Sequence, residues 1–238
     1  MALAHVQSKV NSNTSTTTIA GAYASNVTSG NLLVVLWEIQ GTALTQPTTV
    51  SISDTIGNVW IPVYGSIQNV TGVTPKVSVQ GWCCVTKSSG ANTVTLTYNA
   101  SGTVGLSMLC TSEFSGWTGT TATIDSGVFA TSAGGAAGTY AFPTLTFVTN
   151  HANEVIFAIE IVSGTNSITS STYAAPFTKT ATGTANLNCG YHLPGAAGTY
   201  NENGTWVTAA SSNGIIAFGV AIAQPSLSNA LMLMGCGT

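Results

Sequence analysis

The chain has 238 residues, and only 5% of them are charged: four lysines, no arginine and seven acidic residues give a net charge of −3, whereas about 25% charged residues is usual. A hydrophobic content of 44% with so small a net charge excludes a disordered chain. The four lysines, Lys9, Lys76, Lys87 and Lys179, are too scattered in sequence for the basic patch that nucleic-acid binding needs, so we expect no nucleic-acid partner. The length is typical of one large all-β domain. Its weakly charged surface would repel other copies little.

No stretch predicts a membrane span, because the longest apolar runs, such as LLVVLW at residues 32–37, fall far short of about 18 residues. The opening residues, 1–18, lack both the basic start and the apolar segment of a signal peptide. We therefore expect a protein made in the cytoplasm and used without Sec export, or a shortened chain.

The sequence pattern is that of β-strands throughout. In residues 92–99 (NTVTLTYN) apolar residues alternate with threonine, which is typical of a strand with one buried and one solvated face. Residues 103–110 continue the alternation after a turn, and together the two runs predict a hairpin. The other predicted strands lie near residues 32–40, 48–53, 58–63, 76–87, 142–149, 154–162, 185–192, 204–209 and 214–223.

Many short strands with turn signals between them, and no helical stripe, predict an all-β fold. We expect a jelly-roll-like antiparallel β-sandwich that forms a single domain over residues 1–224. The tail, residues 225–238, is apolar, and we expect it to dock on its own domain or on a neighbouring subunit. Its assembly contacts would be Leu231, Met232, Leu233 and Met234.

One sequence echo suggests an internal repeat. GAAGTY occurs at residues 135–140 and again at 195–200, and each copy is followed by a similar strand, TFVT at 146–149 and TWVT at 205–208. The echo predicts two related strand–turn–strand units. Chance similarity in a chain rich in Gly, Ala and Thr is the alternative.

Five cysteines lie at irregular spacing, and no C-x-x-C or Cys/His pattern of a zinc site accompanies them. Neighbouring residues of a strand point to opposite faces, so the two adjacent cysteines cannot easily serve one site. We expect free buried thiols, with one disulfide involving Cys110 or Cys189 as the alternative. The five are Cys83, Cys84, Cys110, Cys189 and Cys236.

The glutamates of NEVIFAIEIV, residues 153–162, do not form a catalytic pair. Glu154 and Glu160 share one face of the predicted strand but lie about 20 Å apart, whereas glycoside hydrolysis needs about 5 to 9.5 Å. We expect Glu160 to face solvent or to accept hydrogen bonds at a sheet rim. A meeting with Glu38 or Glu113 across neighbouring strands is the alternative.

No motif predicts a catalytic residue, a cofactor or a metal, so we expect a protein that is not an enzyme. The three histidines, His5, His151 and His192, are scattered in sequence. Asp54 and Asn58 in SDTIGN offer oxygen atoms to calcium, but a turn held by the Asp side chain is the preferred interpretation.

Two of the five tryptophans lie in polar surroundings. Trp117 in EFSGWTGT and Trp206 in NENGTWVT are candidates for an exposed platform on which a sugar of a cell-surface glycan could stack, while Trp37 and Trp82 lie in apolar strands and are expected in the core. These residues define the alternative function, a carbohydrate-binding surface module.

Several motifs in order resemble a concanavalin-like jelly-roll module of bacteriophage tail or appendage proteins and of bacterial surface proteins. They are GNLLVV (30–35), SDTIGNVW (53–60), GANTVTLT (90–97), EFSG (113–116) and ANEVIFA (152–158). The resemblance covers roughly residues 5–223, implies a non-enzymatic attachment or structural module, and carries over no catalytic residue. The adjacent pair Cys83 and Cys84 and the absence of arginine depart from it.

The sequence therefore predicts a structural subunit of a virion, or of another extracellular assembly, whose partners are copies of itself or other structural subunits. Its expected location is the virion, with the cell surface or the extracellular space as the alternative.

Overall fold

The computed structural model describes residues 2–14, 17–64, 66–163, 168–182, 186–208 and 214–225. Among these residues no helix is long and apolar enough to cross a membrane. The predicted tail contacts Leu231, Met232, Leu233 and Met234 lie outside the described residues, as does Cys236.

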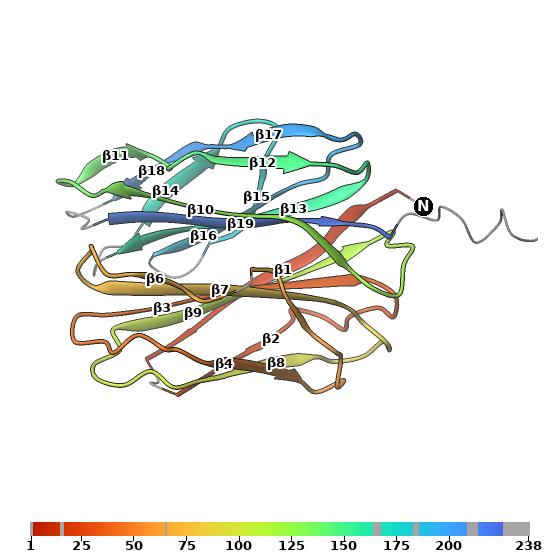
Figure 1. Ribbon diagram of the computed structural model, residues 1–238, viewed down its shortest axis with the longest axis horizontal. Coiled ribbons are helices and arrows are strands. Elements are labelled where there is room, and N and C mark those ends of the chain that lie inside the picture. The colour runs from red at the N-terminus through yellow and green to blue at the C-terminus, as the bar shows by residue number, and fades with distance from the viewer. Residues whose placement is uncertain are drawn as a thin grey trace, which may run out of the picture.

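The described chain is all-β, as predicted, and its strands stack in four layers (Figure 1). The first half contributes two of them. Its first inner sheet has the order β1-β9-β3-β7-β5, with β6 also paired to β7. The strands are β1 (Ala4–Asn13), β9 (Leu106–Ser115), β3 (Leu32–Gly41), β7 (Lys76–Val85), β5 (Ile61–Pro62) and β6 (Gln68–Val70).

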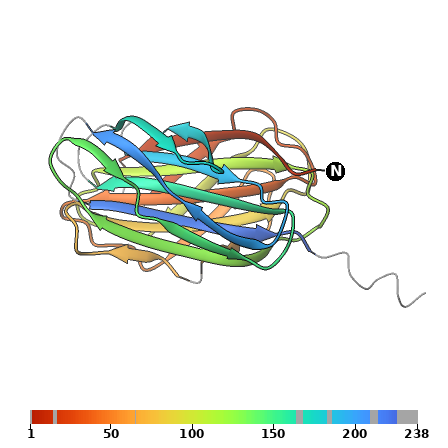
Figure 2. The ribbon, with the colours of Figure 1, turned by 90° about the horizontal axis from the view of Figure 1, so that it is seen from above.

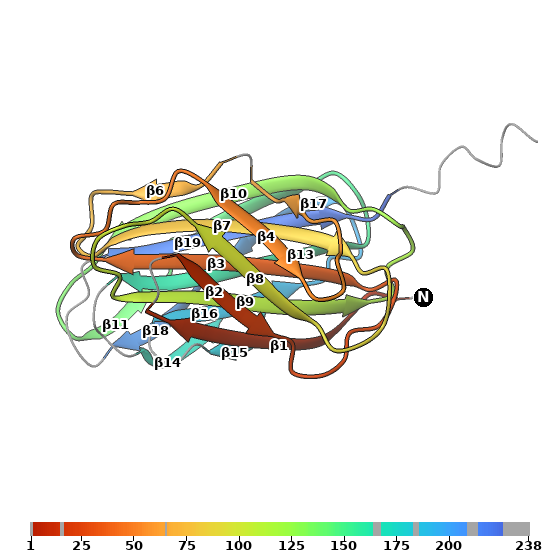
Figure 3. The same cartoon turned by 90° about the horizontal axis from the view of Figure 1, so that it is seen from below.

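The first outer sheet covers one face of the first inner sheet and has the order β2-β8-β4. Its strands are β2 (Thr18–Ala22), β8 (Thr93–Tyr98) and β4 (Val50–Asp54). They run obliquely across the strands of the first inner sheet (Figure 3). The apolar residues of β8 are buried while its threonines are partly or fully exposed, so the predicted alternation is confirmed.

The second half contributes the other two layers. Its second inner sheet has the order β10-β19-β13-β16-β15, with the strands β10 (Thr123–Ala133), β19 (Gly214–Ala223), β13 (Glu154–Ser163), β16 (Leu187–His192) and β15 (Thr178–Thr182). The second outer layer is made of β11-β18-β14 and β12-β17. These strands are β11 (Gly138–Ala141), β18 (Gly204–Thr208), β14 (Ile168–Tyr173), β12 (Leu145–Thr149) and β17 (Gly198–Glu202).

The two halves repeat one topology. In each inner sheet the first strand of the half pairs with the last strand, which pairs with a long central strand: β1-β9-β3 in the first half and β10-β19-β13 in the second. In each half an outer strand that directly precedes the last inner strand, β8 or β18, lies at the centre of a three-stranded outer sheet. One strand order therefore occurs twice along the chain, a repeat that the strand patterns of the sequence do not predict.

The two halves share one core and form a single sandwich-like domain. The largest apolar cluster lies between the inner sheets and combines residues of β3, such as Leu32 and Leu36, with residues of β13 such as Phe157. Because β3, β13 and β19 are covered on both faces, all of their residues are buried, and most of those residues are apolar. Seen from above, the strands of the stacked layers run mostly along the long axis (Figure 2).

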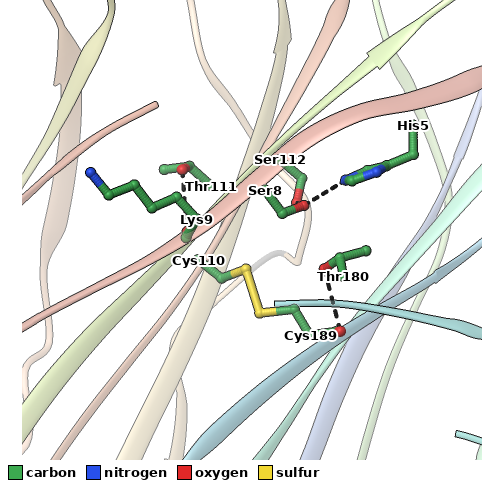
Figure 4. Close-up of a disulfide and its surroundings, with 8 residues drawn as sticks. All are labelled: His5, Ser8, Lys9, Cys110, Thr111, Ser112, Thr180 and Cys189. Carbon is green, nitrogen blue, oxygen red and sulfur yellow. Dashed lines mark hydrogen bonds between the residues drawn. A yellow bond between two sulfur atoms is a disulfide. The ribbon is translucent and has the colours of Figure 1, made fainter. Parts of the chain in front are cut away.

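A disulfide joins the halves across this core. Cys110 in β9 is bonded to Cys189 in β16 (Figure 4), which fits the predicted alternative of one disulfide. Cys83 and Cys84 are free and buried, and they face different clusters, as predicted from their adjacent positions.

The predicted hairpin of residues 92–99 and 103–110 is wrong. β8 pairs with β2 and β4, whereas β9 pairs with β1 and β3, so the turn between them carries the chain from an outer sheet to an inner sheet. The alternation of apolar residues identified both strands but not their partners.

The GAAGTY echo corresponds to a cross-paired arrangement. The first copy supplies β11 and β12 and the second supplies β17 and β18; β11 pairs with β18, and β12 pairs with β17. Tyr140 lies opposite Trp206, and Phe147 lies opposite Tyr200. The two similar units therefore lie side by side in one layer.

Candidate functional site

All five glutamates of the chain are fully buried, although acidic side chains are rarely buried without partners. The two aspartates are partly buried. The glutamates therefore define the interior chemistry of this protein more than its surface; they are Glu38, Glu113, Glu154, Glu160 and Glu202.

Glu113 is surrounded by donors. Its carboxylate accepts a hydrogen bond from the Asn31 Nδ2 group at 2.6 Å, from the Thr28 backbone N–H at 2.8 Å and from the Gln7 Nε2 group. Three donors on one buried carboxylate make strong, charge-assisted bonds. They tie β9 to the loop before β3 and to β1.

Glu160 and Glu202 form a buried carboxyl pair between the second inner sheet and the second outer layer. Among the described residues, no N–H or O–H donor reaches any of their four oxygen atoms. The hydrogen bond between the two side chains therefore needs a proton held by one of them. Burial, followed by the charge of Glu202, raises the pKa of Glu160 well above its usual value.

Burial also raises the pKa of Glu202, to about 7, and the hydrogen bond with Glu160 partly offsets this shift. The neighbouring Tyr173 has its pKa raised well above the usual value, first by burial and then by the two carboxyl groups. Because both glutamates are sealed from solvent, the pair can store a proton but cannot touch a substrate.

The expectation that Glu160 faces solvent or a sheet rim is wrong. One face of β13 packs on the core shared by the two halves, and the other is covered by β12, β17 and β18. Its neighbour is Glu202, not Glu38 or Glu113. Glu38 lies in the first half, where burial raises its pKa well above the usual value and a hydrogen bond with Gln40 opposes the shift.

A second acidic group lies at one end of the second inner sheet. His151 Nδ1 is 3.8 Å from Asp125 Oδ1 and 3.7 Å from Glu154 Oε1. These three residues place one possible metal-ligating atom each within 4.8 Å of one another. The sequence predicts no metal cluster, because His151 is one of three histidines that are scattered along it.

Local structure explains how these side chains meet. The register of β10 against β19 shifts between Ile124 and Ser126, so Asp125 sits at a β-bulge, a feature that redirects a side chain. Asn150 holds the Asp125 carboxylate through its backbone N–H at 2.6 Å and its Nδ2 group at 2.8 Å. The backbone N–H of His151 donates to Glu154 Oε1 at 2.9 Å.

The two carboxyl groups of this cluster differ in their pKa. Burial and the nearby charge of Asp125 raise the pKa of Glu154 to about 7 against the hydrogen bond from His151. For Asp125, burial acts to raise the pKa, but the hydrogen bonds from Asn150 and Glu154 and the nearby His151 outweigh it and lower the pKa. One proton is therefore held mainly on Glu154.

The proposed sugar platforms are not exposed. Trp206 is fully buried between the outer and inner layers, where its ring packs edge-on against Phe142. Trp117 is 8% exposed, and its indole N–H donates to the Thr121 carbonyl at 3.0 Å. Both rings are covered by the protein although polar residues surround them in sequence, so neither indole offers a face to a sugar. Trp37 and Trp82 are in the core, as predicted.

The oxygen atoms of the possible calcium site already accept hydrogen bonds from neighbouring groups. Asp54 accepts from the Asn58 backbone N–H at 2.8 Å and from the Nδ2 groups of Asn58 and Asn92 at 2.7 and 3.0 Å. Asn58 Oδ1 accepts from the Lys87 N–H at 3.0 Å. The segment is the side-chain-held turn that was the preferred interpretation.

The other two histidines pack against aromatic rings. His5 stacks on Tyr191, and His192 lies against Phe177 and Tyr200. Burial lowers the pKa of both, partly offset by hydrogen bonds with the backbone.

Comparisons of the chain with protein-family models, with curated proteins and with solved structures find no match.

Proposed function

We propose that this chain is a non-enzymatic structural subunit of a virion, or of another extracellular assembly, in which copies pack against one another. The observation that carries the proposal is the burial of all five glutamates. The solvent-facing side of both outer layers is rich in neutral hydroxyl and amide side chains, with Val148 of β12 also exposed there. Exposed examples are Ser51, Ser53, Thr97, Thr146, Thr199, Asn201 and Thr205.

A surface of this kind favours close packing because little charge repulsion separates two copies, and |net charge| near zero promotes association. Lys9, Lys87 and Lys179 are exposed. No lysine forms a salt bridge within the described ranges.

The disulfide between Cys110 and Cys189 supports a working place outside the reducing cytosol, because disulfides persist in oxidising surroundings. The sealed Glu160–Glu202 pair supports a non-enzymatic role, since its carboxyl groups do not reach the surface. The resemblance of the strand motifs to phage appendage modules favours the virion among extracellular assemblies.

Multi-angle light scattering of the full chain over a wide range of concentrations tests the proposal. We expect the mass to rise with concentration to a defined multiple of 24.1 kDa. A mass that stays at one chain up to the highest concentration would contradict it. Deletion of residues 225–238 in a second sample shows whether the apolar tail contributes: a lower association constant assigns it a contact, while an unchanged one assigns the contacts to the sandwich.

A further inference from the structure

We propose that Asp125, His151 and Glu154 bind a divalent transition-metal ion of the zinc type at the end of the second inner sheet. The proposal goes beyond the structural role of the chain and does not depend on it.

The spacing of the side chains fits such an ion. A tetrahedral zinc ion with bonds of about 2.1 Å holds its ligand atoms about 3.4 Å apart. His151 Nδ1 lies 3.8 Å from Asp125 Oδ1 and 3.7 Å from Glu154 Oε1. The half-exposed His151 ring needs to move only a few tenths of an ångström toward each oxygen. The two carboxylate oxygens lie within 4.8 Å of each other and would have to approach by up to about 1.4 Å to reach this spacing.

The buried member of the group lacks a donor on one side. Glu154 is fully buried, and its Oε2 atom has no hydrogen-bond partner among the described residues. Asp125 faces Glu154, and the two side chains share a hydrogen bond and one proton. A cation between them would take the place of that proton and bind both carboxylates.

The neighbouring residues hold the ligands in place as outer partners of a metal site do. The two Asn150 donors fix the Asp125 carboxylate, and the backbone N–H of His151 fixes Glu154 Oε1. Asn153 has a left-handed backbone conformation (φ 59°) in the turn that carries His151 back over Glu154. The ligands come from β10, from this turn and from the first residue of β13.

The donor set selects the class of ion. One imidazole nitrogen and two carboxylates suit zinc and similar transition metals, whereas calcium and magnesium prefer oxygen ligands alone.

The side chain of His151 is 47% exposed, and a surface pocket of about 430 Å³ adjoins it, lined in part by Thr118 and Gln224. The pocket gives the ion a path from solvent and room for a water ligand.

Such an ion would act as a clamp. It would tie the start of β10 to the start of β13, close to the end of β19, where Thr123 and Glu154 both pair with Ala223. We therefore expect metal binding to stabilise the folded chain.

The test is a calorimetric titration of the full oxidised chain, freed of metal with a chelator, with zinc chloride. We expect one ion per chain, a higher melting temperature with zinc, and no comparable effect of calcium or magnesium. Asp125→Asn and His151→Ala should each weaken binding at least tenfold. His192→Ala, a histidine outside the cluster, should leave it unchanged. Glu154→Gln keeps the acceptor for the His151 N–H and should fold while losing affinity.

Cobalt distinguishes this site from the free thiols. We expect a cobalt spectrum without a thiolate charge-transfer band, abolished by His151→Ala. A thiolate band, no bound ion, or zinc affinity equal in wild type and His151→Ala would each overturn the proposal. Should His151→Ala fail to fold, His151→Gln provides the same comparison with a larger polar side chain.

Discussion

The two halves of the molecule share a strand order but differ in the groups that surround their acidic side chains. In the first half, Glu113 and Asp54 are each surrounded by amide donors. In the second half, acids face acids: Glu160 lies against Glu202, and Asp125 lies near Glu154. Glu38 is the exception in the first half, where Gln40 is its polar neighbour.

The difference shows that burial alone does not decide what a carboxyl group does. With several N–H donors around it, the group holds neighbouring segments together through hydrogen bonds. With a second acid as its neighbour the group must hold a proton or bind a cation. The same double topology thus carries donor-bound acids in one half and pairs of acids that share a proton in the other.

The disulfide links the two halves covalently, and its loss should have the largest effect. Cys110 and Cys189 are 79 residues apart in sequence, for which the chain-entropy model gives about 4 kcal/mol of stabilisation. The double variant Cys110→Ala, Cys189→Ala should lower the free energy of unfolding by about that amount in urea denaturation. Reductant should destabilise the wild type and leave the variant unchanged. Equal midpoints for the wild type with and without reductant would refute the prediction.

Breaking the donor network of the first half should have the next largest effect. Glu113→Gln puts an amide NH2 group where three donors converge on one carboxyl group, and we expect the free energy of unfolding to fall by about 3 kcal/mol. Chemical denaturation measures it. Gln7→Ala, which removes the donor from β1 alone, serves as the milder control. If Glu113→Gln leaves the free energy of unfolding unchanged, the network contributes little.

The matching substitution in the second half should have the opposite sign. The folded-state pKa of Glu202, about 7, exceeds the usual 4.5, so the folded state binds more protons between these values and wild-type stability falls as the pH rises through this range. Glu202→Gln removes that penalty and should stabilise the protein at pH 8 by about 2 kcal/mol and hardly at pH 4. Melting temperatures at both pH values measure this. A destabilising effect at pH 8 would contradict the shared-proton pair.

The smallest effect should come from the turn at Asp54. Asp54→Ala leaves the donors of Asn58 and Asn92 without their acceptor, but the site is only partly buried, so water replaces part of the loss. We expect about 1 kcal/mol of destabilisation in urea denaturation and no change in the response to calcium. A calcium-dependent melting temperature in the wild type that disappears in Asp54→Ala would restore the calcium interpretation.

Part of this architecture follows from the sequence. Alternation of threonine with apolar residues identified β8, and the mostly apolar runs of β3, β13 and β19 identified these strands but not that both of their faces are covered. β1 and β10 were missed because edge strands mix polar and apolar residues without a clear period. The doubled topology was missed because it depends on strand pairing, which single-strand patterns do not contain.

The contacts among the acidic residues could not be predicted from the sequence for a related reason. Glu202 and Glu160 lie in different layers, and their contact depends on how the layers stack. His151 and Glu154 are three residues apart and could have been paired from sequence, but Asp125 joins them only through the bulge in β10. The buried tryptophans show the reverse case, in which polar sequence neighbours suggested exposure that the layers exclude.

The proposed function requires that copies pack through the uncharged outer faces. Thr97 in β8 and Thr205 in β18 are exposed, and each lies on the central strand of a three-stranded outer sheet. Sedimentation velocity of Thr97→Glu and of Thr205→Glu, each beside the uncharged Thr→Gln variant at the same position, tests this packing. We expect at least one glutamate variant to sediment as a smaller species than its glutamine partner. Identical sedimentation of all four variants and the wild type would contradict it.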